Sequence, residues 1–141
     1  MYSFFESQIK LLNFPKIEDP RGKLTFIQNP DQIPFKIKRV FWTYDVPGGV
    51  QRGGHAFKLQ QEVIIALSGS FEVILKDEFG KRESFLLNRS YVGLYIPPLK
   101  WRSIENFSTN SVALHLTSTM FDENDYLRDF DLFKKYISEK F

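Results

Sequence analysis

Short runs of apolar residues, separated by turn-forming residues, cover most of this chain. In Phe71–Lys76 the apolar positions alternate, so Phe71, Val73 and Leu75 share one face of an extended segment. Glu62–Leu67 is almost continuously apolar, which indicates a strand buried on both faces. Further strands are expected at Leu24–Gln28, Lys38–Asp45, Glu83–Leu87, Val92–Ile96, Lys100–Glu105 and Ser111–Thr117. Strands that recur about every 8–12 residues, with turn signals between them, predict an all-β sandwich or barrel.

The C-terminal end has a different pattern. The acidic run Asp122–Asp125 is typical of a helix start, where the positive end of the helix dipole favours carboxylates. Apolar residues then recur at helical spacing between Asp129 and Phe141, at Phe130, Phe133, Tyr136 and Ile137. We expect this aromatic stripe to be a packing face. The chain is predicted to be one domain over 1–141, with an N-terminal arm at 1–15 and a helical tail at 122–141.

Composition narrows the class of protein. The 141 residues are 43% apolar and 16% aromatic, which fits one domain with a substantial core. The chain has no cysteine, so disulfides, thiol nucleophiles and thiolate metal sites are excluded. Nineteen basic against 17 acidic residues give a net charge of +2, which argues against a nucleic-acid-binding protein. No signal-peptide or membrane-spanning pattern is present, so we expect no membrane association and a cytoplasmic location.

The segment Arg52–Lys58 carries the most informative motif, because it is followed by Glu62 and Gly69. His-x-His, then Glu, then Gly after six intervening residues is the pattern of the cupin fold, in which two His and the Glu bind a metal. In an extended strand, His55 and Phe57 point to the same face. The spacing is present here, but Phe57 stands where the second His is expected.

The ligand set does not favour a metal. A third His is expected near Pro98–Asn106, where the local spacing is one residue short, and Arg102 occupies its place. His55 and Glu62 supply two ligands, whereas catalytic zinc or non-haem iron sites use three. The other histidine, His115, alternates with Leu114 and Leu116, and we expect it to be structural.

A pocket with one histidine and several arginines suits proton transfer on an anionic substrate. Histidine has an ordinary pKa of about 6.5, so His55 can accept and return a proton near neutral pH. Arginine binds phosphate oxygens bidentately and stabilises developing oxyanions. The position of His55 directly after Arg52-Gly53-Gly54 favours this interpretation over a buried structural histidine.

Several segments in a fixed order give the chain a family resemblance from about Lys16 to Ile137. It resembles the sugar 3,4-ketoisomerases, the WxcM-like cupin enzymes that act on dTDP-4-keto-6-deoxy-D-glucose. The matching segments are Asp19–Leu24, Ile33–Val40, Arg52–Ala56, Leu67–Ser70, Gly93–Pro98, Trp101, Asn106–Ser108 and Phe121–Asp129. The resemblance implies a jelly-roll barrel of the cupin type with a short C-terminal helix.

The family's activity implies an isomerase that needs no cofactor. Removal of the C3 proton beside the C4 ketone gives an enediol(ate), and reprotonation at C4 moves the carbonyl to C3. By resemblance, His55 is the catalytic base, while Arg39 and Arg52 lie near the sugar and diphosphate. Tyr95 is expected to line the cleft. A dTDP-sugar substrate and a homodimer with exchanged N-terminal strands are also implied.

Departures from the family limit these expectations. The family usually has His-Ala-His, and Phe57 cannot form hydrogen bonds or carry a proton, so we expect no two-histidine mechanism. One branch of the family has Arg and His, and another Tyr and Arg, at the positions of Arg21 and Arg102. Because this chain has Arg at both substrate-binding positions, the product's C4 configuration does not follow from the sequence.

Three other functions stay open at this point. The same pocket fits a non-catalytic dTDP-sugar-binding module that Phe57 has silenced. It also fits an isomerase or epimerase of another nucleotide sugar, because aromatic stacking tolerates any base. A metal-dependent cupin oxygenase is the remaining alternative.

Overall fold

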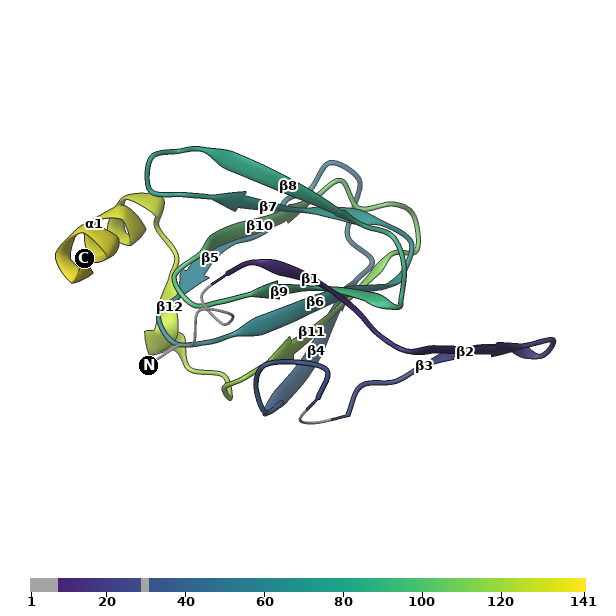
Figure 1. Cartoon of the computed structure of the whole chain (residues 1–141). Coiled ribbons are helices and arrows are strands. Elements are labelled where there is room, and N and C mark those ends of the chain that lie inside the picture. The colour runs from purple at the N-terminus through teal and green to yellow at the C-terminus, as the bar shows by residue number, and fades with distance from the viewer. Residues whose placement is uncertain (1–7, 29–30) are drawn as a thin grey trace.

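The computed structural model describes residues 8–28 and 31–141 as two facing β-sheets, a projecting hairpin and a C-terminal helix (Figure 1). The first sheet has five antiparallel strands in the order β1 (Lys10–Asn13), β9 (Val92–Ile96), β6 (Glu62–Ser68), β11 (Val112–Thr117) and β4 (Arg39–Tyr44). The second has the order β12 (Tyr126–Leu127), β5 (Arg52–Phe57), β10 (Trp101–Glu105), β7 (Phe71–Lys76) and β8 (Arg82–Leu87).

The main hydrophobic core lies between the sheets. Phe71, Val73 and Leu75 of β7 point inward, as their alternation predicts, and meet Ile64 of β6 and Ile104 of β10. The outer face of β6 is also covered. There Val63 and Ile65 are buried against the side chains of Phe14 and Ile33. Burial on both faces is what the continuous apolar run of β6 indicates.

The expected all-β jelly roll with a short C-terminal helix is confirmed. The hydrogen bonding of the described residues leaves two separate sheets, so the architecture is a sandwich and not a closed barrel (Figure 1).

Gly69 turns the chain between β6 and β7 with φ +66°, and a Cβ there would meet the side chain of Ser108 and lie 2.9 Å from Ser111 Cα. Glycine is therefore required at this turn.

The C-terminal tail contains two short helices where the sequence pattern predicts one. The acidic run forms η2 (Glu123–Asp125), a 3₁₀ turn capped by Asp122. The chain then extends as β12 and begins α1 (Phe130–Lys140) at Asp129, whose carboxylate accepts from two backbone N–H groups at 2.8 and 3.1 Å. The expectation that the acidic run starts the main helix is wrong, because pairing of β12 with β5 holds the intervening residues extended.

The aromatic stripe of α1 is a packing face, as predicted. Phe133 is buried, and Phe130 and Tyr136 are partly buried beside it. Their contact on the sandwich is Trp101 of β10, whose ring lies edge-on to Phe130 with centroids 5.3 Å apart. These contacts fix the tail over one end of the second sheet.

The N-terminal region differs most from expectation. β2 (Lys16–Asp19), which the pattern did not predict, pairs with β3 (Gly22–Thr25) as a hairpin that projects away from the sandwich (Figure 1). β3 begins and ends earlier than the predicted Leu24–Gln28. The arm at 1–15 includes β1 in the first sheet, and its residues 1–7 lie outside the described residues.

A single domain over 1–141 stays a prediction. In the described part of the chain, no helix is both long and apolar enough to cross a bilayer.

Candidate active site

A cavity of about 400 Å³ opens between the inner faces of the two sheets. Strands β4, β5, β6, β10, β11 and β12 all contribute to its wall. The lining side chains are mainly aromatic, imidazole, guanidinium and carboxylate groups. They belong to Phe41, Thr43, Gln51, Arg52, Gly53, His55, Phe57, Glu62, Ile64, Arg102, Ile104, His115, Tyr126 and Arg128.

A β-bulge in β5 places both Arg52 and His55 at this cavity. Residues three apart in a regular strand point to opposite faces. Here Arg52 pairs with Ile104 and His55 pairs with Arg102, so two residues of β5 face one residue of β10. Gly53 takes φ +75° within the bulge. The extra residue brings Arg52 and His55 to the same side, and bulges commonly re-aim side chains in this way near active sites.

His55 is half-buried among aromatic rings. Its ring lies edge-on to Phe57, with centroids 4.8 Å apart, and is 5.2 Å from the ring of Tyr126. Burial, with the positive charge of Arg102 as the next cause, lowers the pKa of His55 from 6.5 to about 3. The imidazole is therefore neutral near pH 7, in the form that accepts a proton.

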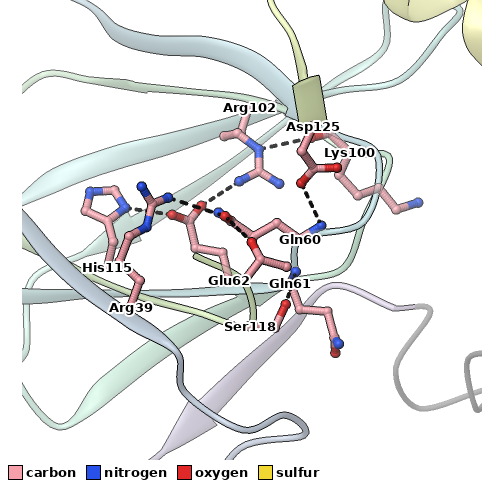
Figure 2. Close-up of polar contacts among 10 residues, drawn as sticks. Arg39, Gln60, Gln61, Glu62, Lys100, Arg102, His115, Ser118 and Asp125 are labelled. Atoms are coloured by element: carbon pink, nitrogen blue, oxygen red, sulfur yellow. Dashed lines mark hydrogen bonds and ion pairs between the residues drawn. The ribbon is translucent and has the colours of Figure 1, made fainter. Parts of the chain in front are cut away.

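Glu62 connects two other cavity residues in a buried network (Figure 2). Arg102 Nη1 donates to Glu62 Oε1 at 2.5 Å, and His115 Nδ1 lies 2.9 Å from Glu62 Oε2. Arg102 Nε donates to the Lys100 carbonyl at 3.0 Å, and its guanidinium lies 5.1 Å from the Phe57 ring centre. Arg102 Nη2 has no hydrogen-bond partner among the described residues, although it is buried at the cavity.

The charges of this network are set by competition between burial and pairing. Burial alone would raise the pKa of Glu62, but His115 and Arg102 outweigh it and lower that pKa. Burial lowers the pKa of Arg102, and Glu62 opposes this change. We take Glu62 as ionised and Arg102 as a cation, because each is the other's counter-ion at hydrogen-bond distance.

The C-terminal tail completes the cavity through Tyr126 and Arg128. Asp125 anchors this segment, because its buried carboxylate accepts from the backbone N–H groups of Leu59 at 2.7 Å and Gln60 at 3.1 Å. Arg128 lies 4.1 Å from the Tyr126 ring centre and makes two hydrogen bonds to Glu123, at 2.7 and 2.9 Å. The exposed guanidinium of Arg128 is thus held at the cavity.

Three of the six residues predicted to act in catalysis or substrate binding lie together in the cavity wall: His55, Arg52 and Arg102. Arg39 points to the inner side of β4 but does not line the cavity. Its guanidinium lies 4.7 Å from the Phe41 ring centre and donates to Gln60 at 3.3 Å.

Two other expected site residues lie elsewhere. Tyr95 is fully buried in the core on the outer side of the first sheet, where its hydroxyl donates to Gln61 at 2.8 Å. The expectation that Tyr95 lines the cleft is corrected, because its neighbours Leu94 and Ile96 point inward and strand side chains alternate. Arg21 stands at the tip of the projecting hairpin with its side chain 90% exposed and paired with Asp19. The hairpin projects from the two sheets (Figure 1), and Arg21 is not among the residues that line this chain's own cavity.

Tyr126 and Arg128 are cavity residues that the sequence pattern did not predict. Both lie in the segment Phe121–Asp129 that matches the family, and the acidic residues around them led to a helix prediction instead. Among residues 8–28 and 31–141, no three His, Cys, Asp or Glu side chains cluster in a way that could hold a metal ion.

Replacing Glu62 by Gln should strongly destabilise the fold. The change leaves Arg102 buried without a counter-ion, which typically costs about 3–5 kcal/mol in the free energy of unfolding. Urea unfolding followed by circular dichroism measures this. Asp19→Asn, which breaks the exposed pair with Arg21, is the matched control and should leave stability unchanged. Equal effects of the two variants would contradict the importance assigned to the buried pair.

Acid should destabilise the protein partly through His55. The pKa of His55 is lower in the folded protein than in the unfolded chain, so between about pH 6.5 and pH 3 the unfolded state binds more protons. Stability should fall as pH falls through this window. Between pH 7 and 4.5, the wild type should lose about 2–3 kcal/mol more than His55→Gln, which cannot titrate. Equal losses in urea unfolding would show that His55 is not held neutral.

Nearly the whole chain is similar to one family of proteins. The family model described as FdtA: WxcM-like, C-terminal matches residues 7–138. A curated relative from Aneurinibacillus thermoaerophilus, named TDP-4-oxo-6-deoxy-alpha-D-glucose-3,4-oxoisomerase, is 42% identical over 130 residues, covering 92% of this chain and 93% of the relative.

Solved structures agree with this result. QdtA, a sugar 3,4-ketoisomerase from Thermoanaerobacterium thermosaccharolyticum in complex with TDP, superposes with a TM-score of 0.90 at 36% identity, covering 99% of both chains. A variant of that enzyme with one histidine replaced by asparagine, in complex with TDP-4-keto-6-deoxyglucose, also gives 0.90, at 37% identity over 94% of this chain and 96% of that one. The chain therefore belongs to the WxcM-like family of sugar 3,4-ketoisomerases.

Proposed function

We propose that this chain converts dTDP-4-keto-6-deoxy-D-glucose to its 3-keto isomer through an enediol(ate), with His55 as the base. The substrate is carried over from relatives at 36–42% identity. The reaction moves a carbonyl between neighbouring carbons without net redox. Cytoplasmic location remains part of the proposal.

One observation carries the proposal: a neutral imidazole lies in the same cavity wall as a buried guanidinium with a free donor. His55 is neutral near pH 7 because its pKa is lowered. Arg102 Nη2 is buried there without a partner in the described part of the chain. An unpaired buried donor is unfavourable until a ligand oxygen accepts from it.

The reaction follows from these two groups. His55 takes the proton from C3, and the electrons of the C3–H bond form the C3=C4 double bond while C4–O becomes an oxyanion. Arg102 Nη2 stabilises that oxyanion through a charge-assisted hydrogen bond. The protonated His55 then returns a proton to C4 as the C3 carbonyl forms, while the hydroxyl proton of O3 is lost and O4 gains one. Because the sugar ring, the base and the donor are held together, little reorganisation is needed.

Further cations in the cavity wall fit the diphosphate. Arg52 and Arg128 both line the cavity, and Arg52 is exposed. Guanidinium groups bind phosphate oxygens bidentately, and the ring of Tyr126 offers a flat surface for the sugar or base. We assign Arg52, Arg128 and Tyr126 to substrate binding. Arg102 is assigned to the carbonyl group that reacts.

Phe57 favours a second candidate, a non-catalytic dTDP-sugar-binding module. Its ring lies beside His55 where the family has a second histidine, and a phenyl group carries no proton. An isomerase or epimerase of another nucleotide sugar differs from the main proposal only in substrate.

Isotope exchange in deuterated water separates these functions. With dTDP-4-keto-6-deoxyglucose, the wild type should form 3-keto product with deuterium at C4, detected by NMR. His55→Asn should reduce turnover by about 100-fold or more, because a positioned base contributes about 10²–10⁴-fold. TDP binding without exchange would identify a binding module, and absence of TDP binding would contradict both. Arg82→Ala, on the exposed edge of β8 away from the cavity, is the control and should retain turnover.

We also propose a homodimer in which N-terminal elements are exchanged. The hairpin projects from the sandwich, and Ile17 and Leu24, which pair across it, are 59% and 56% exposed. Apolar residues on a two-stranded hairpin need a surface to cover them, because isolated hairpins are marginally stable. In the single chain β1 pairs with β9, and exchange would form the same pair between two chains. Arg21 at the hairpin tip would then serve the partner's cavity.

Subunit complementation tests this exchange. Arg21→Ala and His55→Asn homodimers should both be impaired, but a mixed dimer should contain one complete site. Equal co-expression should restore about a quarter of wild-type turnover, since about half of the dimers are mixed and each has one of two sites intact. Sedimentation velocity measures the assembly. A monomer, or co-expressed variants with no more activity than the separate ones, would contradict the proposal.

A further inference from the structure

His115 is a buried histidine that the mechanism above does not use. It lies on the inner face of β11, is 6% exposed and contributes to the cavity wall together with His55. Its ring stacks on Phe41, with centroids 4.3 Å apart and an angle of 6° between the planes. Stacking and the contact to Glu62 hold this imidazole in one orientation.

Glu62 determines which ring nitrogen of His115 carries the hydrogen. The carboxylate is ionised and therefore only accepts hydrogen bonds, so the Nδ1–H of His115 donates to Oε2 across 2.9 Å. In neutral His115 the lone pair is then on Nε2. A carboxylate fixes the tautomer of a catalytic histidine in the same way in serine proteases.

The Nε2 atom of His115 is buried and has no hydrogen-bond partner in the described part of the chain. Figure 2 shows it on the side of the ring away from Glu62. Buried polar atoms in proteins are nearly always hydrogen-bonded, so Nε2 at this cavity is available to a hydrogen-bonding partner on a bound molecule. A hydroxyl group of a bound sugar would supply that partner.

The proposed reaction moves a second proton, between the two oxygens. Besides the proton that leaves C3 and the one that arrives at C4, the hydroxyl proton on O3 must leave while O4 gains one. The electrons of the O3–H bond form the C3 carbonyl, and the electrons of the C3=C4 bond form the C4–H bond. His55 serves the carbon atoms, Phe57 cannot carry a proton, and a guanidinium stays protonated at neutral pH.

We propose that His115, aligned by Glu62, is a second catalytic residue that carries the hydroxyl proton between O3 and O4 of the sugar. This inference rests on the proposed function, because it divides the two proton transfers of that reaction between two histidines. Its Nε2 accepts the proton from O3, and the resulting imidazolium, stabilised by the Glu62 carboxylate, protonates O4.

His115→Asn tests this division. The asparagine amide can replace the Nδ1–H donor to Glu62 and removes Nε2. In deuterated water, two rates are measured by NMR: deuterium exchange at C3 of recovered substrate and formation of the 3-keto product. Product formation should fall by about 100-fold or more, whereas C3 exchange through His55 should fall by less than about tenfold. The ratio of exchange to turnover therefore rises.

Thr117→Val is the matched control. Thr117 is buried on the same face of β11, two residues on, and donates to the Thr119 carbonyl without lining the cavity. This variant should leave the ratio of exchange to turnover unchanged. Circular dichroism and TDP binding check that each variant is folded, and His115→Gln replaces His115→Asn if the latter does not fold.

The outcomes are distinct. Wild-type turnover in the folded His115 variants, or parallel loss of both rates, would overturn the role of His115 while leaving the proposed function intact. A wild-type enzyme that neither exchanges nor isomerises would overturn the proposed function and this inference with it.

Discussion

The buried carboxylate of Glu62 is the interaction on which the site depends. It is the counter-ion of Arg102 and the acceptor for His115, and these three groups come from three different strands. Well-packed apolar residues often give equal or greater stability than a buried ion pair. A charged network in the middle of an otherwise apolar sandwich is therefore better explained by the chemistry of the cavity than by stability. It supplies a fixed cation and a fixed imidazole tautomer in one place.

Backbone hydrogen bonding brings the remaining groups to this network. β5 pairs with β10 on one side and with β12 on the other, so His55, Arg102 and Tyr126 are held by adjacent strands of one sheet. The Asp125 carboxylate attaches the tail to the loop before β6, where Glu62 begins the strand. The tail therefore belongs to the site, although it follows the jelly roll in the sequence.

The strand pattern was sufficient to predict an all-β sandwich or barrel, and the family resemblance implied the jelly roll. The motif around Arg52 and His55 was sufficient to locate the cavity. The exceptions have physical causes. The apolar run Val92–Ile96 does not show which side chains point inward, and Tyr95 points outward. The acidic residues before Tyr126 favour helix, but pairing of that segment with β5 decides its conformation. Local patterns also do not show that His115 and Glu62, 53 residues apart, form a hydrogen bond.

The bulge at Gly53 makes the backbone conformation of a residue without a side chain as important as the side chains beside it. A β-branched residue at position 53 would disfavour φ +75° and favour regular alternation, in which Arg52 and His55, three residues apart, point to opposite faces of the sheet. A lineage that replaced this glycine would separate the proposed base from the proposed phosphate ligand without changing any functional side chain. Glycine at this position is therefore a criterion for recognising relatives that have kept the site.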